Sequence, residues 1–207
     1  MENFVSPVTI VILAGGLGTR IGGNKGLQIL NGKSLVAWVY EAVKYNQAEV
    51  LINANALQDE YRQLGCRVIK DHVPDLPGPL AGLQAALNSA RTEYVMTVPC
   101  DTPFLPKELM QRLIAALNAN NLEAAVVKTA GFRHPTVALY KKSVLPKLDA
   151  YLASGKRKVN DWLDSLHLSE VEFENAGDFE NINTQEDLAR IKQVLLEAES
   201  CRVKHNG

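Results

Sequence analysis

The sequence predicts an α/β protein with a doubly wound, mostly parallel sheet in three layers, formed by a single domain over residues 1–200. Three observations predict this fold class. Short apolar segments of strand length alternate with segments of helical periodicity, the pattern of a parallel sheet covered by helices. Several apolar segments change abruptly into glycine or polar residues, as strands do where such a sheet binds its ligand. The 207 residues, 46% of them hydrophobic, are enough to bury one substantial core.

Composition and charge exclude several classes of protein. The chain has 22 basic and 23 acidic residues and a net charge of −1, which argues against a broad basic face for nucleic acid. No apolar run approaches the ~20 residues needed to span a membrane. The cysteines Cys66, Cys100 and Cys201 are too widely spaced for a zinc pattern or a disulfide framework. The N-terminal residues lack the features of a secretory signal, so we expect a cytoplasmic protein.

The first expected strand, residues 8–14, leads directly into a glycine-rich loop. Five glycines fall within residues 15–23, and glycine, which has no Cβ, lets backbone N–H groups approach a ligand closely. Two cations, Arg20 and Lys25, lie in or just after the loop, and no carboxylate lies between Val8 and Lys25. A tight surface turn would also be rich in glycine. The strand, the loop and the cations together favour the binding of a phosphate chain.

The loop matches neither of two common phosphate-binding motifs. A Walker loop needs Gly-Lys-Ser/Thr, whereas Lys25 is followed by Gly26. A dinucleotide fingerprint needs a third glycine where Ile21 stands, and an acid at the end of the second strand, which is missing. Residues 13–22 together with Lys25 instead resemble the opening loop of nucleotidyltransferases, which transfer a nucleoside monophosphate from an NTP to a phosphorylated acceptor.

The elements after this loop follow in regular alternation. A short extended piece with an Asn31-Gly32 turn precedes a helix that begins at Ser34, a residue type that caps helices. Further strands are expected at residues 49–52, 66–69, 94–98 and 124–128. The helices between them are expected at residues 57–64, 80–90 and 106–117, and Pro106 suits the first turn of the last of these.

The half of the chain after Gly131 is less regular. We expect an extended segment at residues 137–140, a helix at 143–153 and a short strand at 171–173. Three consecutive cations at residues 156–158 could form a solvated face or could hold a second anionic substrate. A capping box from Thr184 to Asp187 predicts the start of a last helix, and we expect a frayed tail at residues 201–207.

Glycine or polar residues follow four expected strands at the point where each strand ends. Gly15 and Gly16 follow the first strand, Asn53 the second, Asp71 the third and Asp101 the fourth. Because the carboxyl ends of parallel strands meet at one edge of a sheet, we expect these residues to line one site. Loops are polar in general, but that tendency does not account for two solitary acids that each follow an apolar strand.

These residue types suit the transfer of an α-phosphoryl group from an NTP to an acceptor oxygen. Asp101 is the predicted ligand of Mg²⁺, which prefers one or two carboxylates plus phosphate oxygens. Lys25 and Arg20 would balance the charge that builds on the α-phosphate and on departing pyrophosphate. Asp71 could bind ribose or base or assist the metal, and Asn53 could read a base edge or hold a ribose.

No general base stands out in the sequence. His72 and His134 are the nearest candidates, and a lone histidine in a loop is more often simply hydrogen-bonded. An acceptor phosphate is already anionic at neutral pH and needs no base. We therefore expect a phosphate oxygen, rather than a sugar hydroxyl, to be the attacking group.

A series of motifs along the chain carries a more specific resemblance. In order, they are Leu13-Ala14-Gly15-Gly16, Arg20-Ile21-Gly22-Gly23, Lys25-Gly26-Leu27, Asn53-Ala54-Asn55, Asp71, Gly78-Pro79-Leu80-Ala81-Gly82, Pro99-Cys100-Asp101-Thr102-Pro103, His134-Pro135 and Asn181-Ile182-Asn183-Thr184. Together they resemble the molybdenum cofactor guanylyltransferases, the MobA family, over nearly the whole chain. The resemblance implies a Rossmann-like nucleotidyltransferase fold. It also implies an enzyme that uses GTP and Mg²⁺ to attach GMP to the terminal phosphate of molybdopterin, releasing pyrophosphate and forming molybdopterin guanine dinucleotide.

The resemblance further implies a role for each matching residue. The GTP side would comprise Leu13, Ala14, Gly15, Gly16, Lys25, Asn53, Asp71 and Asp101, with Asp101 on the metal. Asn181 and Asn183 would lie on the molybdopterin side, to which we add His134 and the cations at residues 156–158. Expected protein partners are molybdenum-insertion proteins and apo-molybdoenzymes or their chaperones, in transient contact.

Two departures and three alternatives stand beside this interpretation. The family often carries an acid where this chain has Asn24, which leaves Lys25 without an adjacent counter-ion and could alter metal or acceptor handling. The second departure is that residues 16–20 resemble the Gly-x-Gly-Thr-Arg of sugar-nucleotide pyrophosphorylases, although the later Pro-Lys of those enzymes is missing here. A molybdopterin cytidylyltransferase or a sugar-phosphate nucleotidyltransferase is an alternative. A non-catalytic protein that binds GTP or cofactor and delivers it is another, but a pure binder needs no lone carboxylate such as Asp101.

Overall fold

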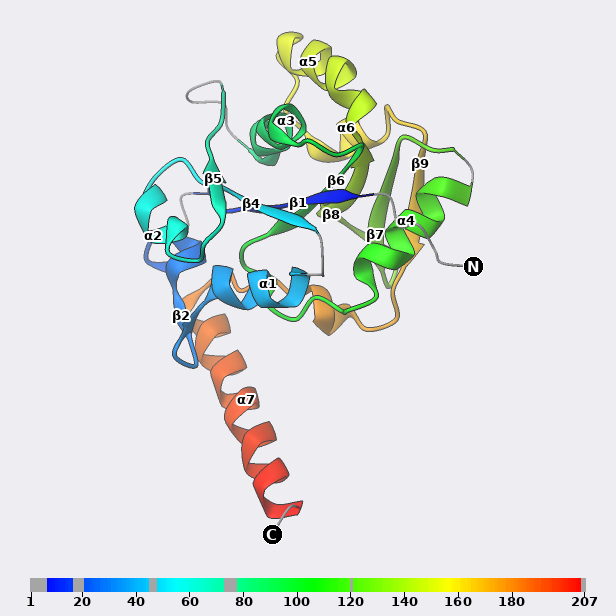
Figure 1. Ribbon diagram of the computed structural model, residues 1–207. Coiled ribbons are helices and arrows are strands. Elements are labelled where there is room, and N and C mark those ends of the chain that lie inside the picture. The colour runs from blue at the N-terminus through cyan, green and yellow to red at the C-terminus, as the bar shows by residue number, and fades with distance from the viewer. Residues whose placement is uncertain (1–6, 17–20, 45–47, 73–77, 120, 206–207) are drawn as a thin grey trace.

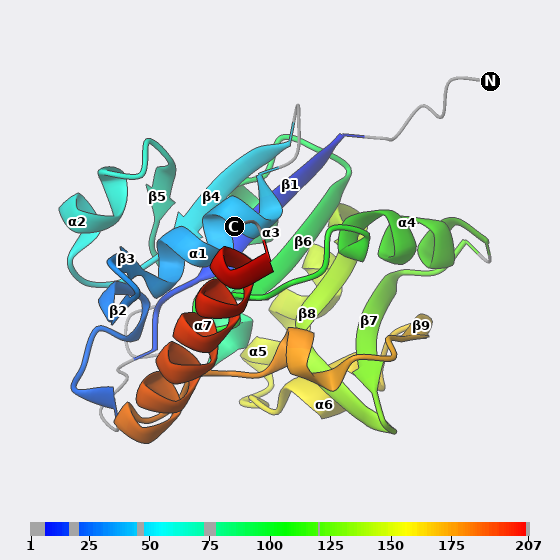
Figure 2. The same cartoon turned by 90° about the horizontal axis from the view of Figure 1, so that it is seen from below.

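The computed structural model describes residues 7–16, 21–44, 48–72, 78–119 and 121–205. At its centre is a seven-stranded sheet in the order β5-β4-β1-β6-β8-β7-β9 (Figure 2). The strands are β1 Val8–Leu13, β4 Glu49–Asn53, β5 Arg67–Ile69, β6 Tyr94–Pro99, β7 Ala124–Thr129, β8 Phe132–Lys141 and β9 Leu168–Glu172. β8 pairs antiparallel with β6 and β7, and the other strand pairs of this sheet are parallel. The predicted doubly wound, mostly parallel sheet is confirmed.

Helices cover both faces of the sheet (Figure 1). They are α1 Leu35–Val43, α2 Gln58–Arg62, α3 Pro79–Ser89, α4 Leu109–Ala119, α5 Leu145–Ala153, α6 Val159–Leu163 and α7 Gln185–His205. Successive side chains of a strand point to opposite faces. Ile10 and Ile12 of β1 accordingly share one core cluster with α1 and α4, while Val11 shares another with α3, α5 and α6. The predicted three layers are confirmed.

Two turns of the structure can be compared with the sequence prediction. β8 begins five positions before the extended segment expected from residue 137, after a turn at Ala130 and Gly131 with φ of 47° and 85°. The chain therefore forms a β7–β8 hairpin, and β8 inserts between β6 and β7. The Asn31-Gly32 turn lies between β2, Ile29–Leu30, and β3, Lys33–Ser34, with φ of 50° and 75°, so this predicted turn is confirmed.

The last helix begins where the capping box predicted but extends further than expected. Its start joins the glycine-rich loop and α1 in a third apolar cluster that includes Ile21, Ile182 and Ile191. The expected frayed tail at residues 201–207 is corrected for residues 201–205, because α7 continues to His205 and extends beyond the other elements (Figure 1). No glycine or proline lies between Gln185 and His205 to end it. Among the described helices, none is both long and apolar enough to cross a membrane.

Candidate active site

The carboxyl ends of three neighbouring strands meet at one edge of the sheet. Leu13, at the end of β1, is in register with Asn53 of β4 and with Pro99 of β6. Two backbone hydrogen bonds extend this pairing past the strand ends, from the Ala14 amide to the Asn53 carbonyl (2.8 Å) and from the Cys100 amide to the Leu13 carbonyl (3.1 Å). The residues that follow these strands are thus brought together as the sequence predicted.

One polar cluster at this edge surrounds Asp71. Its two carboxylate oxygens accept hydrogen bonds from the Nδ2 atoms of Asn53 (2.9 Å) and Asn55 (2.8 Å), and its amide donates to Asn55 Oδ1 (3.0 Å). Asn53 is buried, with 2% of its surface exposed. A Cβ on Gly15 would lie 3.2 Å from Asn55 Nδ2, so the glycine-rich loop passes directly over the amides. Asp71 thereby fixes how both amides are presented.

Helix α3 approaches the same cluster so closely that only glycine fits. A Cβ on Gly82 would lie 2.5 Å from Asn53 Oδ1 and 2.9 Å from Leu13 Cδ2, closer than real Cβ contacts come. The helix begins directly after Gly78, whose φ is 103°, with Pro79 as its first residue. Proline is favoured at that position because its fixed φ suits a first helical turn. The Gly-Pro-Leu-Ala-Gly motif therefore brings a helix N-terminus against the sheet edge.

A second polar cluster surrounds Asp101, which follows β6 and is 3% exposed. Lys25 Nζ forms an ion pair with Asp101 Oδ2 and donates to Asn183 Oδ1 (2.6 Å). Asn181 Nδ2 donates to the same Asp101 oxygen (3.1 Å), and the Ile182 amide donates to the Asp101 carbonyl (2.9 Å). Asp101 is buried and Lys25 is partly exposed, so loss of Lys25 would leave a buried carboxylate without its counter-ion.

The donor set around Asp101 fits a divalent cation that a substrate helps to bind. No hydrogen bond from the described residues reaches its other carboxylate oxygen, Oδ1. In the described part of the chain, no three His, Cys, Asp or Glu side chains gather where they could hold a metal by themselves. One carboxylate complemented by phosphate oxygens and waters is the arrangement typical of Mg²⁺.

The backbone of the glycine-rich loop accounts for Asn24. Gly22, Gly23 and Asn24 have positive φ angles of 95°, 85° and 44° in succession, just before the short 3-10 helix Lys25–Leu27. Asparagine is among the few non-glycine residues that tolerate the left-handed region. The position therefore suits Asn on conformational grounds. Arg20, the other predicted cation of this loop, lies outside the described residues.

His134 lies in β8, where its side chain contacts Thr129 and Phe179. Its Nε2 is 2.7 Å from Thr129 Oγ1, and its ring centroid is 5.2 Å from that of Phe179. Burial lowers the pKa of His134 below its ordinary value. No hydrogen bond among the described residues links His134 to Lys25 or Asp101.

The cations at residues 156–158 lie just before α6. Arg157 Nη1 donates to the Leu152 carbonyl (2.7 Å), and Lys156 Nζ lies 5.7 Å from the centre of the Tyr151 ring. Val159, which follows the run, lines a small and mainly apolar recess. The other residues of the recess come from β1, α3, β6 and β8, and are Leu13, Pro79, Leu80, Leu83, Thr97, Pro135, Thr136 and Tyr140.

One contact of the site has no counterpart in the sequence pattern. Gln185, the first residue of α7, donates from Nε2 to the carbonyl of Ile21 in the glycine-rich loop (2.6 Å). The two residues are 164 positions apart, and a glutamine after a capping threonine looks like an ordinary helix start. The sequence therefore did not predict this contact of Gln185. The capping box predicted only that a helix begins here.

Known proteins resemble the chain in sequence and in structure. The family model described as the MobA-like NTP transferase domain matches residues 10–171. A Shewanella baltica protein named molybdenum cofactor guanylyltransferase is 38% identical over 192 residues, which cover 92% of this chain and 98% of that protein. A protein of the same name from Cupriavidus pinatubonensis is 42% identical over 187 residues, covering 87% and 94%. The crystal structure of molybdopterin-guanine dinucleotide biosynthesis protein A from Archaeoglobus fulgidus matches with a TM-score of 0.75 at 25% identity, covering 91% of this chain and 99% of that one.

Proposed function

The chain belongs to the family of MobA-like NTP transferase domains, and from that premise we propose that it transfers GMP from GTP to the terminal phosphate of molybdopterin. Pyrophosphate is released, and molybdopterin guanine dinucleotide is the product. The proposal draws its substrates from relatives at 38% and 42% identity that carry the name molybdenum cofactor guanylyltransferase. The observation that carries it is the Lys25–Asp101 pair, which lies at the same sheet edge as a glycine-rich loop.

The nucleotide side of the proposed site is built from the glycine-rich loop and the polar cluster around Asp71. The backbone of Leu13, Ala14, Gly15 and Gly16 would approach the nucleotide, as a glycine-rich loop after a strand does. Asn53, with its buried amide oriented by Asp71, would read the base or hold the ribose. The close fit at Gly82 supports this assignment, because it fixes Asn53 from the other side.

The reacting side of the proposed site is built around Asp101. Nucleotidyltransferases of this family use a divalent metal, and we propose Mg²⁺, which Asp101 would hold and which would neutralise triphosphate charge. Lys25, together with Arg20, would stabilise the charge that develops at the α-phosphorus and on the leaving group. An acceptor phosphate oxygen forms the new bond to the α-phosphorus, and the bond from that phosphorus to the oxygen that bridges to the β-phosphate breaks. No proton has to be removed from an acceptor that is already anionic.

The acceptor would approach from the side of β8 and the turn before α7. Asn181 and Asn183 lie on that turn, and His134 lies on β8. The cations at residues 156–158, just before α6, would add positive charge for an anionic acceptor. We also propose that the protein acts in the cytoplasm. Transient contacts would pass the product to apo-molybdoenzymes or their chaperones.

Release of labelled pyrophosphate tests the proposal. The wild-type chain should release it from GTP only when molybdopterin and Mg²⁺ are both present, and less or none from CTP, ATP and UTP. Asp101→Ala should abolish release, and Asp101→Asn should retain the fold while losing the charge. Preferred turnover of CTP would indicate a cytidylyltransferase, and GTP binding without any release would indicate a delivery protein. Wild-type turnover by Asp101→Ala would remove the metal assignment.

A further inference from the structure

The turn at residues 180–187, which includes the first three residues of α7, contacts three separate parts of the site. Asn181 Nδ2 donates to Asp101 Oδ2, and Asn183 Oδ1 accepts from Lys25 Nζ. Gln185 Nε2 donates to a carbonyl of the glycine-rich loop. These three contacts converge on the proposed metal ligand, the proposed phosphate-binding lysine and the proposed nucleotide loop. The position of this turn therefore sets the position of the groups that would react.

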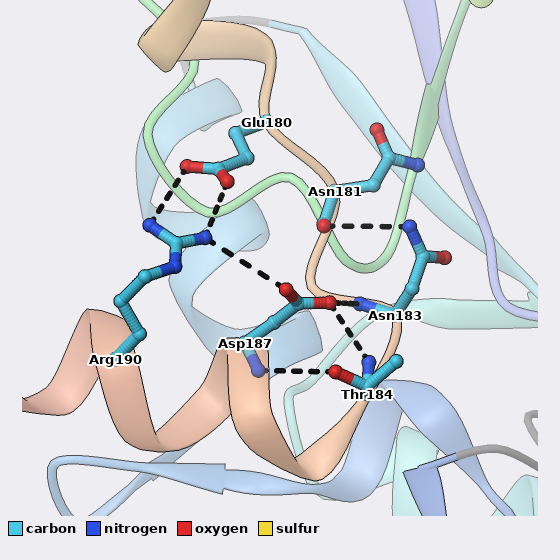
Figure 3. A network of polar contacts seen from close by, with 6 residues as sticks. All are labelled: Glu180, Asn181, Asn183, Thr184, Asp187 and Arg190. Atoms are coloured by element: carbon cyan, nitrogen blue, oxygen red, sulfur yellow. Dashed lines mark hydrogen bonds and ion pairs between the residues drawn. The ribbon is translucent and has the colours of Figure 1, made fainter.

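The turn is held by a carboxylate that does not touch the site. Asp187 Oδ2 accepts hydrogen bonds from the amides of Asn183 (2.9 Å) and Thr184 (3.0 Å), and the Asp187 amide donates to Thr184 Oγ1 (3.1 Å) (Figure 3). The hydrogen bond from the Asn183 amide lowers the pKa of Asp187 most, which keeps this carboxylate charged. In Figure 3 the side chains of Asn181 and Asn183 point away from α7, on the side opposite Asp187.

The bond to the Asn183 amide goes beyond what the helix needs. Thr184 is the residue before α7, so the exchange between Thr184 and Asp187 is a capping box, which completes the hydrogen bonding of a helix N-terminus. Asn183 precedes the cap, and its amide belongs to the turn rather than to the helix. Satisfying it fixes the backbone from which Asn183 reaches Lys25.

Arg190 joins the two ends of the same turn. It donates to both carboxylate oxygens of Glu180 and lies 3.8 Å from Asp187 Oδ1 (Figure 3). All three side chains are substantially exposed, and exposed ion pairs add little stability. Their arrangement instead restricts the ends of the segment that carries Asn181 and Asn183.

We propose that Asp187 is a positioning residue for nucleotidyl transfer, acting through the turn at residues 180–187 on Lys25 and Asp101. This inference rests on the proposed function, because it assumes that Lys25 and Asp101 act on a metal-bound NTP. It assigns to the start of α7 a role in catalysis in addition to the helix capping that the sequence predicts. Loss of Asp187 frees the Asn183 amide, and the contacts to Lys25 and Asp101 lose their fixed geometry.

The test compares Asp187→Ala with Ala189→Gly. Ala189 is an exposed residue of the same helical turn, and glycine there weakens the helix without touching the 180–187 turn. Both variants should lower the melting temperature. We expect only Asp187→Ala to weaken GTP binding and kcat, by roughly 10-fold or more, as loss of a residue that orients a metal ligand typically does. GTP binding is measured by calorimetry with Mg²⁺ and again with EDTA, because Lys25 should bind phosphate without the metal.

Asp187→Asn supplies the conservative comparison. Its amide oxygen can accept the same two backbone hydrogen bonds, so this variant should regain most of the GTP affinity lost in Asp187→Ala. The inference is overturned if Asp187→Ala and Ala189→Gly, at similar melting temperatures, agree within about twofold in GTP affinity and kcat. Failure of the proposed function is recognised separately, because then the wild-type chain itself releases no pyrophosphate from GTP. In that case the same binding comparison is made with the NTP that stabilises the wild type most.

Discussion

Replacing Gly82 by alanine should destabilise the protein although alanine is the better helix former. The added Cβ would lie 2.5 Å from Asn53 Oδ1 and 2.9 Å from Leu13 Cδ2. Asn53 cannot turn aside freely, because it is buried and its Nδ2 donates to Asp71 Oδ1 at 2.9 Å. Either α3 moves away from the sheet, or Asn53 gives up its hydrogen bond to a carboxylate.

The magnitude follows from three opposing effects. Overpacking of a core site costs about 1–3 kcal/mol, and a lost hydrogen bond to a charged group costs a similar amount. The helical preference of alanine over glycine returns about 1 kcal/mol. Only one of the two costs is incurred, and the 2.5 Å approach places it in the upper half of its range, at about 2–3 kcal/mol. After the helical gain is subtracted, the net loss in the free energy of unfolding should be about 1–2 kcal/mol. For a domain of this size that corresponds to a drop of roughly 2–8 °C in the melting temperature.

Urea unfolding of Gly82→Ala, Asn53→Ala and the double variant measures the effect as a cycle. Asn53→Ala removes the nearest atom, so Gly82→Ala should cost at least ~1 kcal/mol less in that background than in the wild type, as residues in contact couple by such amounts. GTP binding should weaken in both single variants. A Gly82→Ala variant as stable as the wild type, or more stable, would show that α3 does not approach Asn53 as closely as described.

Three further predictions concern residues near the site and in the core. Gly26→Ala should lower the free energy of unfolding, measured in urea, by about 1–3 kcal/mol. The Cβ of the new alanine would lie 2.9 Å from the hydroxyl of the buried Tyr61, and an unchanged unfolding midpoint would contradict this. Trp38→Phe should cost about 1–3 kcal/mol, since it removes the 2.8 Å bond to the Leu30 carbonyl, and a neutral result would refute that bond's importance. Burial lowers the pKa of His134 from 6.5, so the unfolded chain binds that proton more readily and the free energy of unfolding should fall below about pH 6.5. His134→Gln should show a smaller fall between pH 7 and pH 5, and equal slopes would count against this.

The gathering of polar residues at one edge of the sheet could be predicted because it depends on local patterns. Short apolar strands are each followed by one of the residues Gly15, Asn53, Asp71 and Asp101. Parallel strands bring such positions to one edge whatever the order of the strands in the sheet, so the order need not be known. The pairing of Asp71 with Asn53 could not be predicted. Either residue alone suits a ligand, and only the register of β4 beside β5 brings the acid and the amide together.

The arrangement around His134, Asn181 and Asn183 could not be predicted, because its strand pairing and contacts are non-local. After Phe132, β8 continues with Arg133, His134 and Pro135, which break the apolar pattern and hide the first half of a long strand. Its antiparallel place between β6 and β7 follows from the turn at residues 130–131, not from hydrophobic periodicity. The contacts of Asn181 and Asn183 span 80 and 158 residues, a separation at which the sequence pattern alone carries no pairing information.

The contacts that hold the Lys25 ammonium group in place leave one of its donors for a phosphate. An ammonium group has three donors, and within the described residues Asp101 and Asn183 accept two of them. The third donor can reach a phosphate oxygen while both contacts persist. An arginine keeps the charge but spreads its donors over a rigid planar fork, which does not reproduce this compact geometry.

Lys25→Arg should therefore fold and still bind GTP, with kcat reduced by about 10²-fold, the cost typical of losing one well-placed donor to transition-state charge. Lys25→Met, which lacks the charge, should also weaken GTP binding and should destabilise the fold by leaving Asp101 buried without its partner. The two variants are compared by single-turnover kinetics and calorimetry. A kcat for Lys25→Arg within a few-fold of the wild type would mean that Lys25 supplies charge alone, and that its contacts with Asp101 and Asn183 have no part in aligning the phosphate.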